Sequence, residues 1–268
     1  MPGQWSRSRF WLCHFLHSRH EREPVPWDRG LTVNPALAAE LLKWLKRRRT
    51  ADTRIAWFLG LAVREDADDP AYIQALRLMF KERQHHDGLY GRLEAHLGAV
   101  AGSTVSQMGR PGGGRIRDFI RACLGPRFAL SLLVLDHLME LAVLRICEQF
   151  SADPALRGVA AGVGSELNAH IALSSERLTW LYADFNFIRR NLRRLRLRLM
   201  CAAMLIMTRW RYRRLIRTAL PSTWPFLTDT FRRFNRLLEQ IVPYHRHTLR
   251  AVLLRQRQHP YDPHQFVP

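Results

Sequence analysis

The chain has 268 residues, enough to bury a substantial core, and its 47% hydrophobic content excludes a mainly disordered protein. Its four cysteines are scattered with no Cys-x-x-Cys pair, which argues against a zinc ribbon or a disulfide framework and favours a reducing cytosol. The net charge of +19 is uneven, because residues 186–268 carry eighteen Arg, no Lys and only three acids.

The hydrophobic stretches are too short to cross a membrane. Residues 10–16 are too few and too polar for a signal peptide, since histidines and arginines interrupt and follow them. The longest later apolar run, residues 199–207, is about half the length that spans a bilayer. We therefore expect a cytoplasmic protein without a transmembrane helix, which touches a membrane only from its surface if at all.

The predicted elements begin after an irregular leader. Residues 1–34 contain Pro24, Pro26 and Gly30, so no regular element is expected there. Further along, apolar residues recur at helical spacing, and no stretch alternates with period two for long enough to form a strand. Helices are predicted, in chain order, over residues 35–63, 70–97, 127–149, 154–182, 187–220 with a bend near Arg209, and 225–256.

A glycine-rich linker separates the second predicted helix from the third. Its Gly-Gly-Gly at 112–114 lacks the lysine and the flanking strand of a phosphate loop. Such a linker is long enough to cross between the two helix pairs of a four-helix bundle. The sequence thus predicts an all-α protein with a four-helix core over residues 35–182 and a basic helical extension over residues 183–268 that packs on it.

Three of the four predicted core helices carry carboxylate and imidazole groups at spacings of three or four, which place each pair on one helical face. Any single pair of this kind is common in helical sequence and is most often a solvated face. The third-helix residues lie in an apolar run, where buried charges need partners or a metal, so the joint occurrence predicts a metal site. The candidate ligands are Glu82, His85, His86, Asp136, His137, Glu140, Glu166 and His170.

Several stretches resemble bacterial ferritin-like proteins. They are Val25-Pro26-Trp27-Asp28 through Leu31-Thr32, Asp69-Pro70-Ala71-Tyr72, residues 82–86, Ser151-Ala-Asp-Pro-Ala-Leu-Arg157 and His170 through Leu178. The resemblance covers roughly residues 25–180. It implies a ferritin-like four-helix bundle with a di-iron or related site, in a family whose members are often oxidases or oxygenases. On this resemblance the cofactor would be iron, di-iron or mononuclear, or manganese.

The chain departs from the family pattern at the expected ligands. Around the second helix that pattern is Glu-Glu-x-x-His, so with His86 as the histidine the ligand glutamate falls on Arg83. In the same register the third-helix glutamate falls near His137, and on the first helix only Asp52 could bind a metal. The fourth helix departs by one residue, since its glutamate lies four rather than three positions before its histidine.

Two outcomes follow for this site. A histidine-rich mononuclear or altered dinuclear centre would use Asp52, His86, His137 and His170, with Glu82, Glu140 or Glu166 reaching in. In the other outcome no cofactor is bound and the bundle remains as a scaffold. Arg83 beside a metal would be unfavourable by roughly several kcal/mol unless a carboxylate neutralises it, which favours a weakened or lost site. An alternative register, Glu82-x-x-His85 with Glu140 and Glu166, would retain the centre.

The basic C-terminal third has three competing explanations. Residues 189–198 and 209–217 are rich in arginine, and helical winding places Leu192, Leu195 and Leu199 on one stripe. The simplest explanation is a set of solvated arginines whose stems cover the core. A basic amphipathic surface for anionic lipid comes second. Nucleic-acid binding ranks third, because the chain contains no known nucleic-acid module.

Two functions therefore remain as hypotheses. The first is a metal-dependent oxidoreductase or oxygenase that acts on an unidentified small molecule. The second is a non-enzymatic helical scaffold that binds an acidic protein or an anionic membrane through its Arg-rich third. The sequence leaves open whether the chain forms a homodimer.

Overall fold

The computed structural model describes residues 2–18, 22, 24–29, 32–49, 69–100, 125–183, 186–220 and 222–243. Within these ranges the chain forms eight α-helices and one short 3-10 helix, and no strand. The prediction of an all-α protein is therefore confirmed. Asp52 lies outside the described residues, as do the predicted linker and the ends of the first and last predicted helices.

The helices agree with the predicted ranges at most of their described boundaries. In chain order they are α1 (Pro2–His17), η1 (Trp27–Arg29), α2 (Pro35–Arg49), α4 (Pro70–Val100), α6 (Pro126–Phe150), α7 (Pro154–Leu181), α8 (Phe187–Arg211), α9 (Arg213–Ala219) and α10 (Trp224–Ile241). The range predicted as one helix over 187–220 is divided between α8 and α9. The division lies at Tyr212, whose backbone leaves the helical region at φ −114° and ψ 24°.

The prediction of an irregular leader is wrong for residues 2–17, which form α1. Trp11 and Phe15 of this helix are buried at 2% and 0% exposure and belong to the main hydrophobic core. Ser8 also fixes the helix, because its hydroxyl donates to Asp69 Oδ2 at 2.6 Å, just before α4 begins. These contacts are tertiary, and they stabilise a helix whose own sequence is not strongly periodic.

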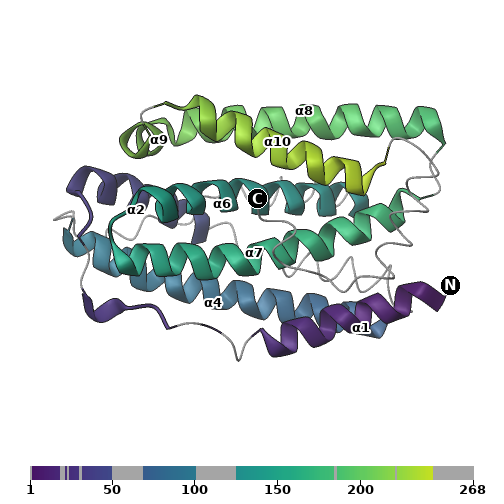
Figure 1. The fold of residues 1–268 in the computed structure, drawn as a ribbon, viewed down its shortest axis with the longest axis horizontal. Coiled ribbons are helices and arrows are strands. Elements are labelled where there is room, and N and C mark those ends of the chain that lie inside the picture. The colour runs from purple at the N-terminus through teal and green to yellow at the C-terminus, as the bar shows by residue number, and fades with distance from the viewer. Residues whose placement is uncertain are drawn as a thin grey trace.

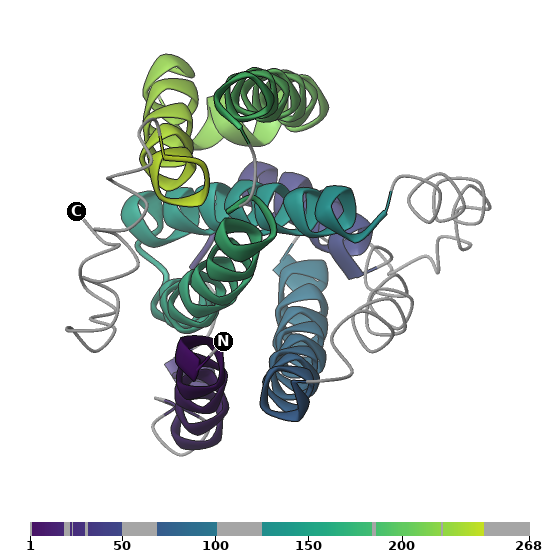
Figure 2. The ribbon, with the colours of Figure 1, turned by 90° about the vertical axis from the view of Figure 1, so that its right-hand side faces the viewer.

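The helices lie in three layers, which Figure 1 shows from the side: α1 and α4, then α6 and α7, then α8 and α10 with α9. Figure 2, turned by 90°, shows the same order. Helices α6 and α7 pack on each other, and α4 is contacted by both α1 and α2. Helix α1 lies against the first part of α4 and α2 against the later part, where the Trp44 and Tyr90 rings are 5.5 Å apart.

The start of α7 is fixed by local capping. The Asp153 side chain accepts from the backbone N–H of Leu156 at 2.7 Å, which satisfies one of the free donors at the helix N-terminus. The other oxygen of Asp153 accepts from the N–H of Thr32 at 2.6 Å, so the same cap ties the segment before α2 to α7. Gly158 lets this segment approach, because a Cβ there would lie 3.2 Å from Pro26 Cδ.

No described helix combines the length and the apolar composition needed to cross a bilayer. The main hydrophobic core includes residues from every layer, from Trp11 of α1 to Leu238 of α10. The helices of the two outer layers, α1 and α4 on one side and α8 and α10 on the other, therefore share one apolar core with α6 and α7.

Candidate functional site

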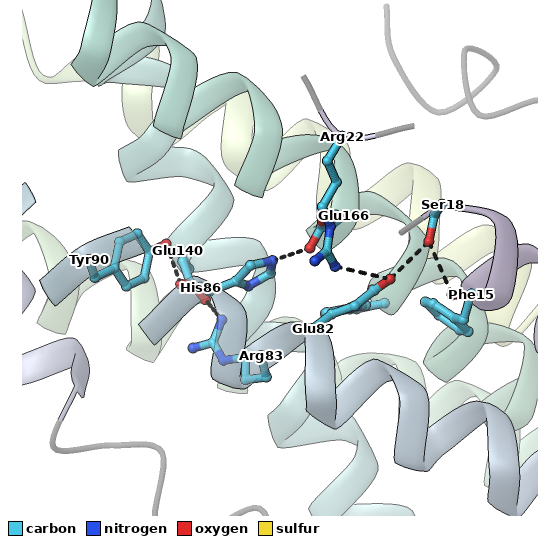
Figure 3. Close-up of polar contacts among 10 residues, drawn as sticks. Phe15, Ser18, Arg22, Glu82, Arg83, His86, Tyr90, Glu140 and Glu166 are labelled. Carbon is cyan, nitrogen blue, oxygen red and sulfur yellow. Dashed lines mark hydrogen bonds and ion pairs between the residues drawn. The ribbon is translucent and has the colours of Figure 1, made fainter. Parts of the chain in front are cut away.

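Charged and imidazole side chains from α2, α4, α6, α7 and the segment after α1 meet inside the bundle. Figure 3 shows part of this cluster, with His86 of α4 between Glu140 of α6 and Glu166 of α7. Nine side chains make up what we call the buried polar cluster: Arg22, Arg48, Glu82, Arg83, His86, His137, Glu140, Glu166 and His170. All except Arg22 and Glu166 are buried.

Glu140 is the centre of one half of the cluster. Its Oε2 accepts from Arg48 Nη2 and from Arg83 Nη1, both at 2.5 Å, and its Oε1 accepts from the Tyr90 hydroxyl at 2.7 Å. Burial alone would raise the pKa of Glu140, but Arg48 and Arg83 outweigh it and hold that pKa well below its usual range. Arg48 also donates to Asp136 at 2.7 Å. Glu140 is therefore an ionised carboxylate neutralised by protein cations.

Two carboxylates, Glu82 and Glu166, form the centre of the other half of the buried polar cluster. His86 Nε2 lies 2.6 Å from Glu166 Oε2, and His170 Nε2 lies 2.9 Å from Glu82 Oε2. Because a carboxylate only accepts, each Nε2 carries the proton and donates it. Arg22 lies between the two acids, with its Nε 2.7 Å from Glu166 and its Nη2 3.7 Å from Glu82 (Figure 3).

Three imidazoles lie in contact between these halves. The ring centroid of His170 is 5.7 Å from that of His86 and 5.5 Å from that of His137. Burial lowers the pKa of His86 to about 4 despite its bond to Glu166, and burial together with Arg83 lowers the pKa of His137 well below 6.5. Both rings are therefore neutral near pH 7. The Nδ1 atoms of all three rings are buried with no hydrogen-bond partner among the described residues.

The structure brings together six of the predicted ligands: Glu82, His86, His137, Glu140, Glu166 and His170. Asp136 lies at the edge of the cluster, with its side chain 47% exposed. His85 lies near Arg22, Glu82 and Glu166 but its side chain is exposed, so the register that pairs Glu82 with His85 does not bring that histidine inward. The prediction of Asp52 as a ligand lies outside the described residues.

Sequence reasoning missed the partners of these ligands. Arg48 shares an inward face with Leu41 and Leu45 of α2, a spacing of four and three that could have indicated its burial. Tyr90 follows His86 by four residues on the buried face of α4 and could have been found in the same way. Arg22 lies in the segment between α1 and η1, and no pattern in the sequence indicates that it reaches α7.

The chemistry of the cluster fits a metal ion poorly. Three arginines face three glutamates, so the carboxylate charge is balanced by the protein itself, whereas a di-metal site needs surplus negative charge around its cations. Arg83 places a guanidinium among the donor atoms. In the described part of the chain, no group of three or more His, Cys, Asp or Glu is placed to hold a metal ion. Comparison of the chain with protein families, with curated proteins and with solved structures finds no match.

Proposed function

We propose that the chain is a ferritin-like bundle in which an ion-pair network takes the place of the metal centre, and that it acts as a binding protein for an anionic partner. The family resemblance supports the bundle, and so does the meeting of α4, α6 and α7 around a polar centre, with α1 and α2 covering α4. The observation that carries the proposal is Arg83, which pairs with Glu140 at 2.5 Å inside the bundle.

The contacts of Arg83 favour a scaffold over an oxidoreductase. A dication at this centre would face a buried guanidinium in a medium that screens charge weakly. It would also have to replace Arg48 and Arg83 on Glu140, which would break two buried ion pairs. His86 and His170 are held by carboxylates through Nε2, and these bonds fix the cluster without a metal. In this proposal the cluster specifies how the helices pack.

The surface of the last three helices supports an anionic partner. Nine arginines of α8, α9 and α10 are exposed: Arg189, Arg196, Arg209, Arg211, Arg213, Arg214, Arg217, Arg232 and Arg236. Among the described residues of these helices the acids are Asp229 and Glu239, and each already pairs with an arginine. Long-range attraction to a negatively charged partner follows from this excess of positive charge.

Metal analysis tests the first half of the proposal. After growth with added iron, the purified chain should contain less than about a tenth of an equivalent of Fe, Mn or Zn, because the glutamates of the buried polar cluster are already paired with arginines. A stoichiometric metal that is lost in His170→Ala while the protein stays folded would overturn the metal-free scaffold and favour the metal-dependent oxidoreductase.

Binding to a soluble polyanion tests the second half. Fluorescently labelled heparin should bind at low salt, with an affinity that falls as added salt screens the arginines. The variant Arg213→Gln/Arg214→Gln/Arg217→Gln should bind more weakly, whereas Lys43→Gln on α2 serves as the matched control and should bind like the wild type. Absence of binding at low salt would contradict an anionic partner.

A further inference from the structure

Helix α8 turns two of its arginines inward and three of its leucines outward, the reverse of what is expected for these residues. The simplest sequence explanation places the leucines on the core and the arginines in solvent. Instead Arg190 and Arg194 are buried, at 5% and 2% exposure, while Leu192, Leu195 and Leu199 are 54% to 66% exposed. Helix α8 therefore presents an apolar face outward.

The inward arginines fix the rotation of α8. Arg194 donates to Glu239 through both Nη atoms and to the carbonyl of Val242 at 2.5 Å, which joins α8 to the end of α10. Arg190 donates to the carbonyl of Ala183 at 3.0 Å. Turning the exposed leucines of α8 onto the core would break the bonds that Arg190 and Arg194 make to Ala183, Glu239 and Val242, so these bonds oppose the rotation.

The exposed residues form one continuous stripe. We call it the α8 stripe and define it by its six large apolar residues, each at least 54% exposed: Ile188, Leu192, Leu195, Leu199, Ile206 and Trp210. Their steps of four, three, four, seven and four keep them on one helical face for about 33 Å. Figures 1 and 2 show α8 in the outer layer, with α6 and α7 on its inner side.

Arginines border the α8 stripe. Arg189 and Arg196 are exposed along one edge, and Arg209 is exposed near its C-terminal end. Helix α8 contains no Asp or Glu at all. An apolar strip with cationic edges and an aromatic residue near its end is the composition of a helix that lies in the interface of an anionic bilayer.

We propose that the α8 stripe inserts into the surface of an anionic lipid bilayer, with α8 parallel to the membrane plane. This inference rests on the anionic-partner function proposed above and names the partner as a membrane surface. The apolar side chains would enter the boundary between headgroups and acyl chains, while the arginines at the edge contact lipid phosphates. Contact of this kind needs no membrane-spanning helix.

Charge argues against a second copy of the chain as the occupant. The stripe has nearly heptad spacing, so two α8 helices could in principle pair through it. Such a pair would bring the bordering arginines of both copies together, with no acid on α8 to compensate them. Like charges across an interface disfavour association, whereas lipid phosphates complement the same arginines.

Vesicle co-sedimentation tests the inference. The full chain should pellet with phosphatidylcholine vesicles that contain phosphatidylserine, and much less with phosphatidylcholine alone. Leu192→Ser/Leu199→Ser should weaken this binding at least about tenfold, because two exposed apolar side chains no longer enter the bilayer. Leu16→Ser is the matched control: this leucine is 48% exposed, on α1 in the opposite outer layer, and its loss should leave binding unchanged.

The outcomes separate this inference from the proposed function. Wild-type binding to heparin without binding to vesicles would overturn the bilayer contact and leave the anionic partner standing. Unchanged vesicle binding of the double variant would overturn the role of the stripe. A lipid-free dimer in sedimentation velocity that Leu192→Ser/Leu199→Ser abolishes would assign the stripe to a second copy instead. Circular dichroism should show the same helix content in all variants.

Discussion

At the scale of single residues, Arg83 determines what the bundle centre can do. It shares Glu140 with Arg48, and it stands where the ferritin-like pattern that the sequence resembles would have a ligand glutamate. Its position next to Glu82 on α4 was visible in the sequence, and so was the cost of a cation there. The sequence did not show which carboxylate neutralises it, because that partner comes from α6, 57 residues away.

Replacing Arg83 with Met should lower the free energy of unfolding by about 3 kcal/mol or more, since it removes one partner of a buried ion pair. Urea unfolding followed by circular dichroism measures this change. Lys43→Met is the control, because Lys43 is 55% exposed in its pair with Glu40 and should contribute less than about 1 kcal/mol. Equal losses in the two variants would contradict a structural role for the buried network.

Some of the remaining site residues could be predicted from helical spacing in the sequence, and others could not. Helical spacing placed Glu166 with His170 on one face correctly, because both are set by the same helix. Arg22 left no signal, since its position depends on how the segment after α1 folds against α7. Local periodicity thus predicts which side chains share a face, but not which elements supply their counter-charges.

At the scale of elements, α1 is the helix that the sequence pattern did not predict. Its apolar stretch is short and is interrupted by a histidine, and neither feature indicates a helix. Two tertiary bonds fix it to α7: Arg7 Nε and Trp11 Nε1 donate to the two oxygens of Glu176, at 2.6 and 2.9 Å. By contrast, α4, α6 and α7 follow long apolar patterns that predicted them nearly to the residue.

The variant Trp11→Ala should lower the free energy of unfolding by about 3 to 5 kcal/mol, because it opens a cavity between α1 and the core and leaves one Glu176 oxygen without its donor. Trp210→Ala provides the control, since Trp210 is 75% exposed and its loss should cost little. Chemical denaturation measures the free energy of unfolding of both variants. A Trp11→Ala protein as stable as Trp210→Ala would show that α1 is not an integral part of the bundle.

At the scale of the whole molecule, one apolar core encloses the polar cluster, so protonation of the cluster is coupled to unfolding. Both His86 and His137 are buried as neutral rings, and unfolding would return them to an ordinary pKa of 6.5. Between that value and about 4 the unfolded chain binds more protons than the folded one. Stability is therefore full above pH 6.5 and falls as the pH is lowered through this window.

We expect the free energy of unfolding to fall by about 2 to 3 kcal/mol between about pH 7.5 and pH 5.5, with further loss at lower pH as Glu140 and Glu166, whose pKa values are lowered, take up protons. Urea unfolding at both pH values measures this decrease in the free energy of unfolding.

His137→Gln should remove about half of the decrease, because one of the two neutral imidazoles is gone. Leu93→Ala, in the core of α4, should lower stability equally at both pH values. A wild type whose stability does not change over this range would contradict neutral, buried histidines.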